Sequence, residues 1–277
     1  MSPLPFQTYS DATEYFGVQI PELFFNNLIT VETYCNRNGY HPLDILDDLF
    51  GFEIIEANEA RYQQTPIELF PFGKTAFAGT HFGFVIHTQD NEDYPSGELC
   101  PMDSDGLIHI GNTSHALFQN LLTDPILIDK HSQLLKVLEL EPIIRKQKRY
   151  DANGNGLRIT VQPKNGWRFV NTSDGVGVFA EEKYFDTSHE LFINDINSAK
   201  RVECFEESTE EMRRKGFYGS QLFYLKELYW YEWTNYELAK KYLNQMLLPY
   251  EQLGRQHLYD TAKEILDSFD VRYPEWQ

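Results

Sequence analysis

The sequence predicts an α+β protein: an N-terminal mixed α/β domain with a mainly antiparallel sheet, a small β-rich middle segment and a C-terminal helical hairpin. Three observations support this class. Apolar side chains recur at helical spacing over residues 20–38, they alternate as in a strand over residues 81–87, and the chain becomes helical and aromatic from Ser208 onward. With 277 residues, 42% of them hydrophobic, the chain can bury a core without disulfides or metal ions.

Two helices are predicted near the N-terminus. The first spans Ile20 to Asn38, with Pro21 in its first turn and Gly39 in a left-handed cap. A second, shorter helix begins at Pro42, and its outer face is acidic. Residues 65–72 follow as an extended segment, which its two prolines restrict to an edge strand or an irregular strand.

The clearest strand covers residues 81–87, because its large apolar side chains all fall on one face. Residues 89–97 have the composition of a polar loop. Residues 103–106 predict a turn into a short strand at 107–110. A helix is expected to follow, with its N-cap at residue 113 or 114.

The rest of the chain is predicted to contain helix, then strands, then helices. Residues 126–149 are mostly helical in pattern, with an interruption at Pro142. Strand patterns at 157–162, 167–170 and 176–180 predict an antiparallel meander, and amphipathic helices are expected at 209–231, 235–248 and 255–269, with Pro249 and Gly254 between the last two. The dense aromatic residues at 217–233 predict a buried stripe, with a binding face as the alternative.

Negative charge is concentrated in the first half of the sequence. Residues 1–128 hold 18 acidic and 3 basic residues, a net charge of −15 out of −18 for the whole chain. The step in charge near Asp129 predicts one domain boundary, and the change to a helical and aromatic pattern at Ser208 predicts a second, which gives segments 1–128, 129–207 and 208–277. A surface this acidic repels nucleic acid and anionic lipid and attracts basic proteins; the alternative is that the acidity only supports solubility. We expect neither nucleic acid nor membrane as a partner.

The cysteine pattern indicates a reducing compartment. The three cysteines, Cys35, Cys100 and Cys204, are odd in number and far apart, and they form no CxxC spacing. The first residues lack the basic and apolar pattern of a signal peptide, and no apolar run reaches the roughly 18 residues that span a bilayer. A cytoplasmic location is therefore expected.

No motif in the sequence requires catalysis. Residues 151–156 resemble the start of a calcium loop, but Gln162 stands where a bidentate Glu is needed. Glycine-rich nucleotide loops and serine nucleophile motifs do not occur, so we expect no catalytic residue, no metal and no cofactor. Two alternatives remain: a helical scaffold that works through the C-terminal hairpin, or a metal- or Cys-dependent hydrolase. The hydrolase would use His81, Cys100, His109 and His115, and His87 belongs to the same histidine-rich segment.

The first 125 residues or so resemble the SUKH superfamily, which includes a yeast regulator of cell-wall synthesis and many bacterial toxin-immunity proteins. Ile20-Pro21-Glu22 resembles the family's "LP" helix start, and Asn38-Gly39 resembles its "nGG" turn with one glycine missing. Residues 77–84 (FAGTHFGF) resemble its "G(D)xxxF" strand. The closing "S-F-x-E-F-L" helix is degraded here to SHALFQNL at 114–121, within the matching segment 110–122. The resemblance implies an α+β fold whose sheet cups a protein partner, and it implies no active site.

The function predicted from these features is the binding of a basic protein, as in an immunity or regulatory protein of the bacterial cytoplasm. Acidic side chains would speed the encounter with the partner, and aromatic side chains would form the desolvated centre of the contact. The predicted contact residues are Asp90, Glu92, Asp93, Tyr94, Glu98, Asp103 and Asp105.

Overall fold

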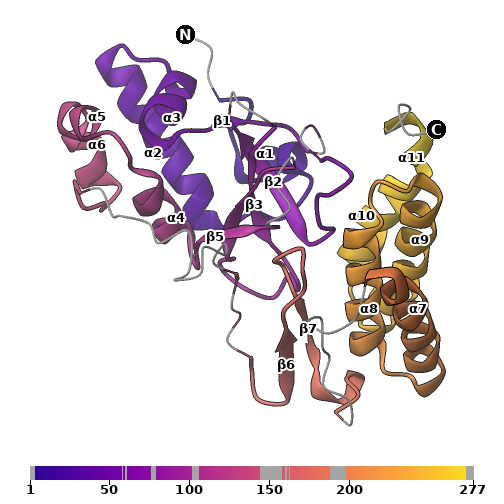
Figure 1. Ribbon diagram of the computed structural model, residues 1–277. Coiled ribbons are helices and arrows are strands. Elements are labelled where there is room, and N and C mark those ends of the chain that lie inside the picture. Colours follow the sequence, from indigo (N-terminus) through magenta and orange to yellow (C-terminus); the bar gives the residue numbers. More distant parts are fainter. Residues whose placement is uncertain are drawn as a thin grey trace. The chain divides into compact units, whose positions relative to one another are not determined.

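The computed structural model confirms the α+β class (Figure 1). It describes residues 4–57, 59, 61–75, 79–101, 106–143, 158–159, 161, 163–187 and 198–272. The chain forms two compact units, Met1–Ile159 and Thr160–Gln277. Residues 151–156, which resemble the start of a calcium loop but were not expected to bind calcium, lie outside the described residues. Within the described part of the chain, no helix is long and apolar enough to cross a membrane.

The first unit combines helices with one five-stranded sheet. Its helices are α1 (Tyr9–Phe16), α2 (Glu22–Asn38), α3 (Pro42–Phe50), α4 (Ser114–Leu121), α5 (Pro125–Lys130) and α6 (Ser132–Val137). Its strands are β1 (Glu53–Ile54), β2 (Leu69–Lys74), β3 (His81–Val85), β4 (Ser96–Leu99) and β5 (Ile108–Gly111). The strands lie in sequence order, and each pairs antiparallel with the next, which confirms the predicted antiparallel sheet.

The polar loop predicted at residues 89–97 is shorter than expected, because strand β4 begins at Ser96. Ser96–Leu99 has weak strand propensity, but it pairs with β3 so that Gly97 lies opposite Gly83. A Cβ atom on Gly97 would lie 2.7 Å from the side chain of Leu107, and one on Gly83 would lie 2.7 Å from Leu69. The two glycines therefore leave room for leucines to lie across the sheet, a packing requirement that local sequence does not reveal.

Helix α2 packs its apolar side against the sheet. It begins after Pro21 and ends at Gly39, whose φ of 76° is the left-handed cap expected from the sequence. Phe24 is fully buried in α2, and its ring centroid lies 4.8 Å from Phe72, 4.9 Å from Phe84 and 5.7 Å from Phe118. One side chain thus joins α2 to strands β2 and β3 and to helix α4.

We expect Phe24→Ala to destabilise the protein by about 3–5 kcal/mol, because it opens a cavity among three aromatic rings. Leu23→Ala is the matched control: Leu23 is the preceding residue of α2 and is 44% exposed. It should cost less than about 1 kcal/mol. Urea unfolding of both variants measures the difference. Equal losses for the two variants would contradict the central position of Phe24.

The step in charge near Asp129 falls inside the first unit. The predicted helical segment at 126–149 is, where described, two short helices, α5 and α6, which meet at His131. Helix α5 packs against α3, and α6 packs against α2. Asp124 caps α5, accepting hydrogen bonds from the backbone N–H groups of Ile126 and Leu127.

The second unit is a β-hairpin with a set of helices. The hairpin consists of the antiparallel strands β6 (Trp167–Val170) and β7 (Val178–Glu181), followed by a short 3₁₀ helix, η1 (Glu182–Tyr184). The helices are α7 (Ser198–Lys215), α8 (Tyr218–Tyr231), α9 (Tyr236–Gln252), α10 (Gln256–Asp267) and α11 (Phe269–Arg272). The unit therefore holds more helix than the predicted hairpin.

Three sequence predictions for the chain after residue 156 need correction. The predicted helix at 209–231 is two helices, because the chain breaks at Gly216, whose φ is 76°. Pro249 lies inside α9 rather than at its end. The predicted strand at 157–162 is not formed at its described residues, 158, 159 and 161. Propensity alone does not distinguish a helix break from a tolerated proline, since both depend on tertiary packing.

Helix α8 is buried on all sides along residues 219–230. It packs against α7, α9, β7 and η1. The prediction of a buried aromatic stripe is confirmed for Phe223, Tyr224, Tyr229 and Trp230, each no more than 8% exposed. A helix buried all round must also bury its polar residues, and those require partners.

Candidate functional site: an acidic groove in the first unit

A groove of about 730 Å³ opens between the start of α2 and the loop at residues 89–94 that joins β3 to β4. The groove is lined by Tyr9, Gln19, Ile20, Glu22, Leu23, Asn26, Gln89, Asp90, Asn91, Glu92, Asp93 and Tyr94. Its walls are the first turn of α2 and the loop. Most of the wall side chains are exposed, whereas Ile20 and Tyr94 are buried beneath them.

Local hydrogen bonds fix both walls. The Tyr9 hydroxyl donates to the carbonyl oxygen of Ile20, which holds α1 against the start of α2. On the other side, the Asp93 carboxylate accepts hydrogen bonds from the backbone N–H of Ser114 and from its hydroxyl, both at 2.8 Å. The loop is thereby tied to the first turn of α4, where a carboxylate is also favoured by the helix dipole.

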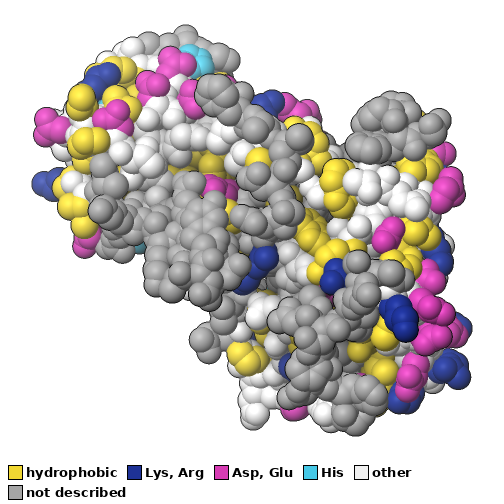
Figure 2. Space-filling model, viewed as in Figure 1, with side chains coloured by type: hydrophobic (Ala, Val, Ile, Leu, Met, Phe, Trp, Pro, Cys, Tyr) yellow, Lys and Arg dark blue, Asp and Glu magenta, His cyan; other side chains and the backbone are white. Residues whose placement is uncertain are grey.

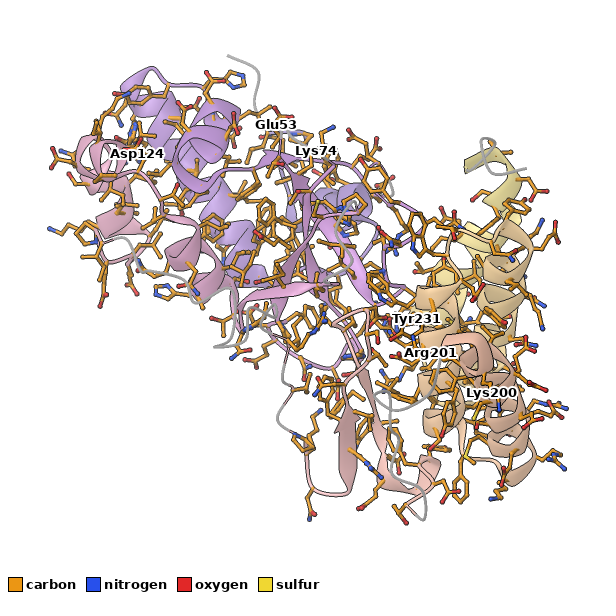
Figure 3. All side chains as sticks on the ribbon, in the orientation of Figure 1. Glu53, Lys74, Asp124, Lys200, Arg201 and Tyr231 are labelled. Atoms are coloured by element: carbon orange, nitrogen blue, oxygen red, sulfur yellow. The ribbon has the colours of Figure 1, made fainter. Side chains whose placement is uncertain are left out.

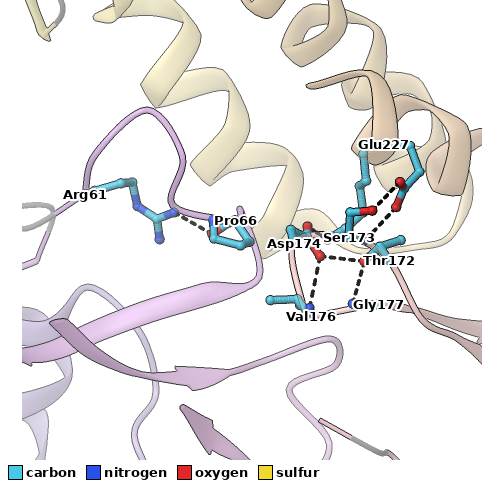
Figure 4. Close-up of polar contacts among 9 residues, drawn as sticks. Arg61, Pro66, Thr172, Ser173, Asp174, Val176, Gly177 and Glu227 are labelled. Carbon is cyan, nitrogen blue, oxygen red and sulfur yellow. Dashed lines mark hydrogen bonds and ion pairs between the residues drawn. The ribbon is translucent and has the colours of Figure 1, made fainter. Parts of the chain in front are cut away.

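The groove is negative, and the cations of the acidic N-terminal segment do not neutralise it. Lys74 forms an ion pair with Glu59, with 2.6 Å between Nζ and Oε1. Arg61 is buried and donates to backbone carbonyls, among them that of Pro66 (Figure 4). The only other cation of residues 1–128 is Arg37, near the far end of α2.

Two groove carboxylates, those of Glu22 and Glu92, form no ion pair with any described lysine or arginine. The second unit differs, since acidic and basic side chains alternate over its helices (Figure 2). Several of them form ion pairs, such as Lys241 with Glu206 and Lys215 with Glu211. Exposed carboxylates beside an exposed leucine are a chemistry suited to a basic segment with an apolar side chain.

The structure brings four of the seven predicted contact residues together in the groove: Asp90, Glu92, Asp93 and Tyr94. Asp93 accepts hydrogen bonds from Ser114, and Tyr94 is only 2% exposed. Both residues therefore support the groove from within and are not free to contact a partner. Glu98 does not line the groove: it is half-buried on β4, opposite Phe82 and Ile108. Asp103 and Asp105 lie outside the described residues.

Sequence reasoning missed the α2 wall, formed by Glu22, Leu23 and Asn26. The apolar residues at helical spacing over 20–38 include Leu23, but it is 44% exposed, whereas the adjacent Phe24 is fully buried. The signal was the pair Leu23-Phe24: successive helical residues point about 100° apart, and the spacing of Phe24, Leu28 and Val31 places Phe24, not Leu23, on the buried stripe.

We expect Asp93→Ala to destabilise the protein by about 1–2 kcal/mol, because Ser114 loses two hydrogen bonds to a carboxylate. The neighbouring Glu92→Ala should change stability by less than about 0.5 kcal/mol, since Glu92 is exposed. Thermal or urea unfolding tests the pair. An unchanged free energy of unfolding in Asp93→Ala would show that Asp93 does not stabilise the fold.

The histidines proposed for a hydrolase do not converge around His81. That side chain is fully buried in β3, where Nδ1 lies 3.0 Å from the Gly79 carbonyl oxygen and Nε2 lies 3.2 Å from the Thr65 hydroxyl. His109 lies on β5, two strands away across β4, a separation of about 10 Å. His115 is exposed on α4. Among the described residues, no cluster of three His, Cys, Asp or Glu side chains could hold a metal ion.

Burial lowers the pKa of His81 to about 4, and the charge of Arg61 acts in the same direction. The unfolded chain therefore binds this proton at a higher pH than the folded chain does. Stability should fall as the pH drops from about 6.5 towards 4, by roughly 2 kcal/mol between pH 7 and pH 5.

Urea unfolding at pH 7 and pH 5 measures this loss. His81→Asn keeps a donor for the Gly79 carbonyl oxygen. It should be less stable than the wild type at pH 7, and its free energy of unfolding should fall less between pH 7 and pH 5. The exposed His115→Asn is the control and should retain the wild-type loss. An unchanged loss in His81→Asn would show that another group causes it.

A scan against models of known protein families finds no match, and a search of curated proteins finds no similar sequence. A function is therefore inferred from the residues and the geometry of the groove.

Proposed function

We propose that the protein is a non-catalytic binding protein of the bacterial cytoplasm, with an immunity or regulatory role, and that its acidic groove captures a basic protein. The observation that carries this proposal is the groove itself. It combines the exposed carboxylates of Glu22 and Glu92 with an exposed apolar side chain, Leu23.

Electrostatics favour a basic partner at this place. The net charge of −15 over residues 1–128 attracts a cationic protein from a distance and raises its association rate. Within the groove, the carboxylates would pair with lysine or arginine side chains. Leu23 would supply the apolar contact that Coulomb attraction alone does not provide, since charged groups at the edge of an interface affect rate more than affinity.

The resemblance to the SUKH superfamily is compatible with this proposal. Antiparallel strands between helices form the α+β architecture that the resemblance implies. The groove lies beside that sheet, between α2 and the β3–β4 loop. Toxin-immunity proteins of the superfamily act by binding, so we infer that a toxin or a regulated enzyme with a basic surface is the partner.

Charge reversal in the groove tests the proposal. The variant Glu22→Lys/Glu92→Lys should lose the partner, with affinity at low salt reduced tenfold or more. The control, Asp44→Lys/Asp47→Lys, makes the same change in net charge on the exposed face of α3. It should slow association moderately and preserve the complex.

Affinity capture from host cells with wild type, groove variant and control provides the measurement. Captured proteins are identified by mass spectrometry, and the purified partner is then titrated at several salt concentrations. A basic protein held by the wild type and the control but lost by the groove variant supports the proposal. Identical captures by all three proteins would refute it.

A further inference from the structure

The buried helix α8 carries two adjacent ionisable residues, Lys226 and Glu227, which are 3% and 0% exposed. Lys226 pairs with Asp174 of the loop that joins β6 to β7, with 3.1 Å between Nζ and Oδ2. Glu227 contacts the same loop through Ser173. A lysine and two carboxylates thus occupy one buried place, which holds more negative than positive charge when all three are ionised.

The loop at 171–177 is organised around these carboxylates (Figure 4). Glu227 accepts hydrogen bonds from the backbone N–H of Ser173 at 2.6 Å and from its hydroxyl at 2.7 Å. Asp174 accepts from the Thr172 hydroxyl at 2.5 Å and from the Val176 N–H at 3.0 Å. The Gly177 N–H donates to the Thr172 hydroxyl. The loop is therefore closed on itself and held to α8 by Glu227.

A chain of hydroxyl groups connects Glu227 with the surface of α8. The Ser173 hydroxyl oxygen lies 3.2 Å from that of Tyr231, and either of the two groups can donate. Tyr231 is 37% exposed, and the Arg201 guanidinium lies 4.1 Å above its ring (Figure 3). Because both hydroxyls can rotate, the hydrogen bonds can run towards or away from Glu227.

We propose that Glu227 and the 171–177 loop form a proton-controlled latch: the protonated carboxyl holds the loop on α8, and ionisation of the carboxyl weakens that hold. In the protonated state Glu227 donates to Ser173, which donates to Tyr231. In the ionised state both bonds reverse. Ionisation leaves Glu227 and Asp174 sharing one buried cation, Lys226, so the closed loop becomes less favourable.

The electrostatics place this change near neutral pH. Burial raises the pKa of Glu227 to about 7, and the charge of Asp174 acts in the same direction, whereas the Ser173 hydrogen bonds and Lys226 act against it. Tyr231 of α8 and Arg201 of α7 lie at the solvent end of the row of hydroxyl groups that begins at Glu227. The charged groups that act on Glu227 are Asp174 of the β6–β7 loop and Lys226 of α8 itself.

With the loop open, the carboxyl is hydrated and has an ordinary pKa near 4.5. As the pH rises from about 4.5 to 7, the open state loses its proton first, so the loop opens more readily. Above pH 7 both states are ionised, and the effect levels off. The latch is independent of the acidic groove, since its residues all belong to the second unit.

Amide hydrogen exchange at Ser173, Val176 and Gly177 tests the latch. After correction for intrinsic exchange rates, protection should fall roughly 50-fold between pH 5 and pH 8, since each unit of pKa difference corresponds to about a factor of ten. Glu227→Gln mimics the protonated carboxyl and should show the same protection at both pH values. The exposed Glu237→Gln on α9 is the control and should keep the wild-type fall. The proposal is overturned if protection in the wild type does not change with pH, or if protection in Glu227→Gln falls as much as in the wild type.

A second measurement covers the case in which Glu227→Gln does not fold. The infrared carbonyl band of a protonated, buried carboxyl should be present at pH 5 and lost with a midpoint near pH 7. Ser173→Ala removes a hydrogen bond from both forms, but the bond to the ionised carboxylate is the stronger of the two, so the midpoint should move to higher pH. Absence of the band at pH 5 in the wild type, or an unmoved midpoint in Ser173→Ala, overturns the proposal.

Discussion

The first unit depends on the packing of one face of α2 against the antiparallel sheet. Phe24 is the centre of that contact, because its ring meets Phe72 of β2, Phe84 of β3 and Phe118 of α4. Further along the same face, Leu28 and Val31 are also fully buried. Hydrophobic burial of this stripe fixes the rotation of α2 about its axis, and that rotation determines which residues remain outside.

The acidic groove is a consequence of that rotation. With Phe24 inside, Glu22, Leu23 and Asn26 face the β3–β4 loop, and Asp93 holds the loop in place through Ser114. The interior of the unit thus determines the composition of the groove. Its acidity persists because the cations Lys74 and Arg61 are engaged elsewhere, in an ion pair and in hydrogen bonds to backbone carbonyls.

The second unit depends on partners for the buried polar residues of α8. Helix α8 packs against α7, α9, β7 and η1, so Lys226 and Glu227 are shielded from bulk water and need partners within the protein. Lys226 and Glu227 find them in the β6–β7 loop. Unpaired, either residue would cost several kcal/mol; paired, they join the hairpin to the helices. Arg255 makes a similar link, donating to the carbonyl oxygen of Phe179 in β7.

The sequence by itself determined the α+β class, the end of α2 at Gly39, the strand β3, the cap of α4 and the acidity of the first half. These features follow from local rules: hydrophobic period, glycine and proline geometry, and the count of charges. Only the tertiary structure decided that Ser96–Leu99 is a strand, that Pro249 lies within a helix, and that Leu23 is outside while Phe24 is inside. It likewise decided that Asp93 and Tyr94 support the groove, and that Glu227 meets Ser173, 54 residues away in the chain. These outcomes depend on which surfaces meet in space, and a pattern read along the chain carries no information about partners so distant in sequence.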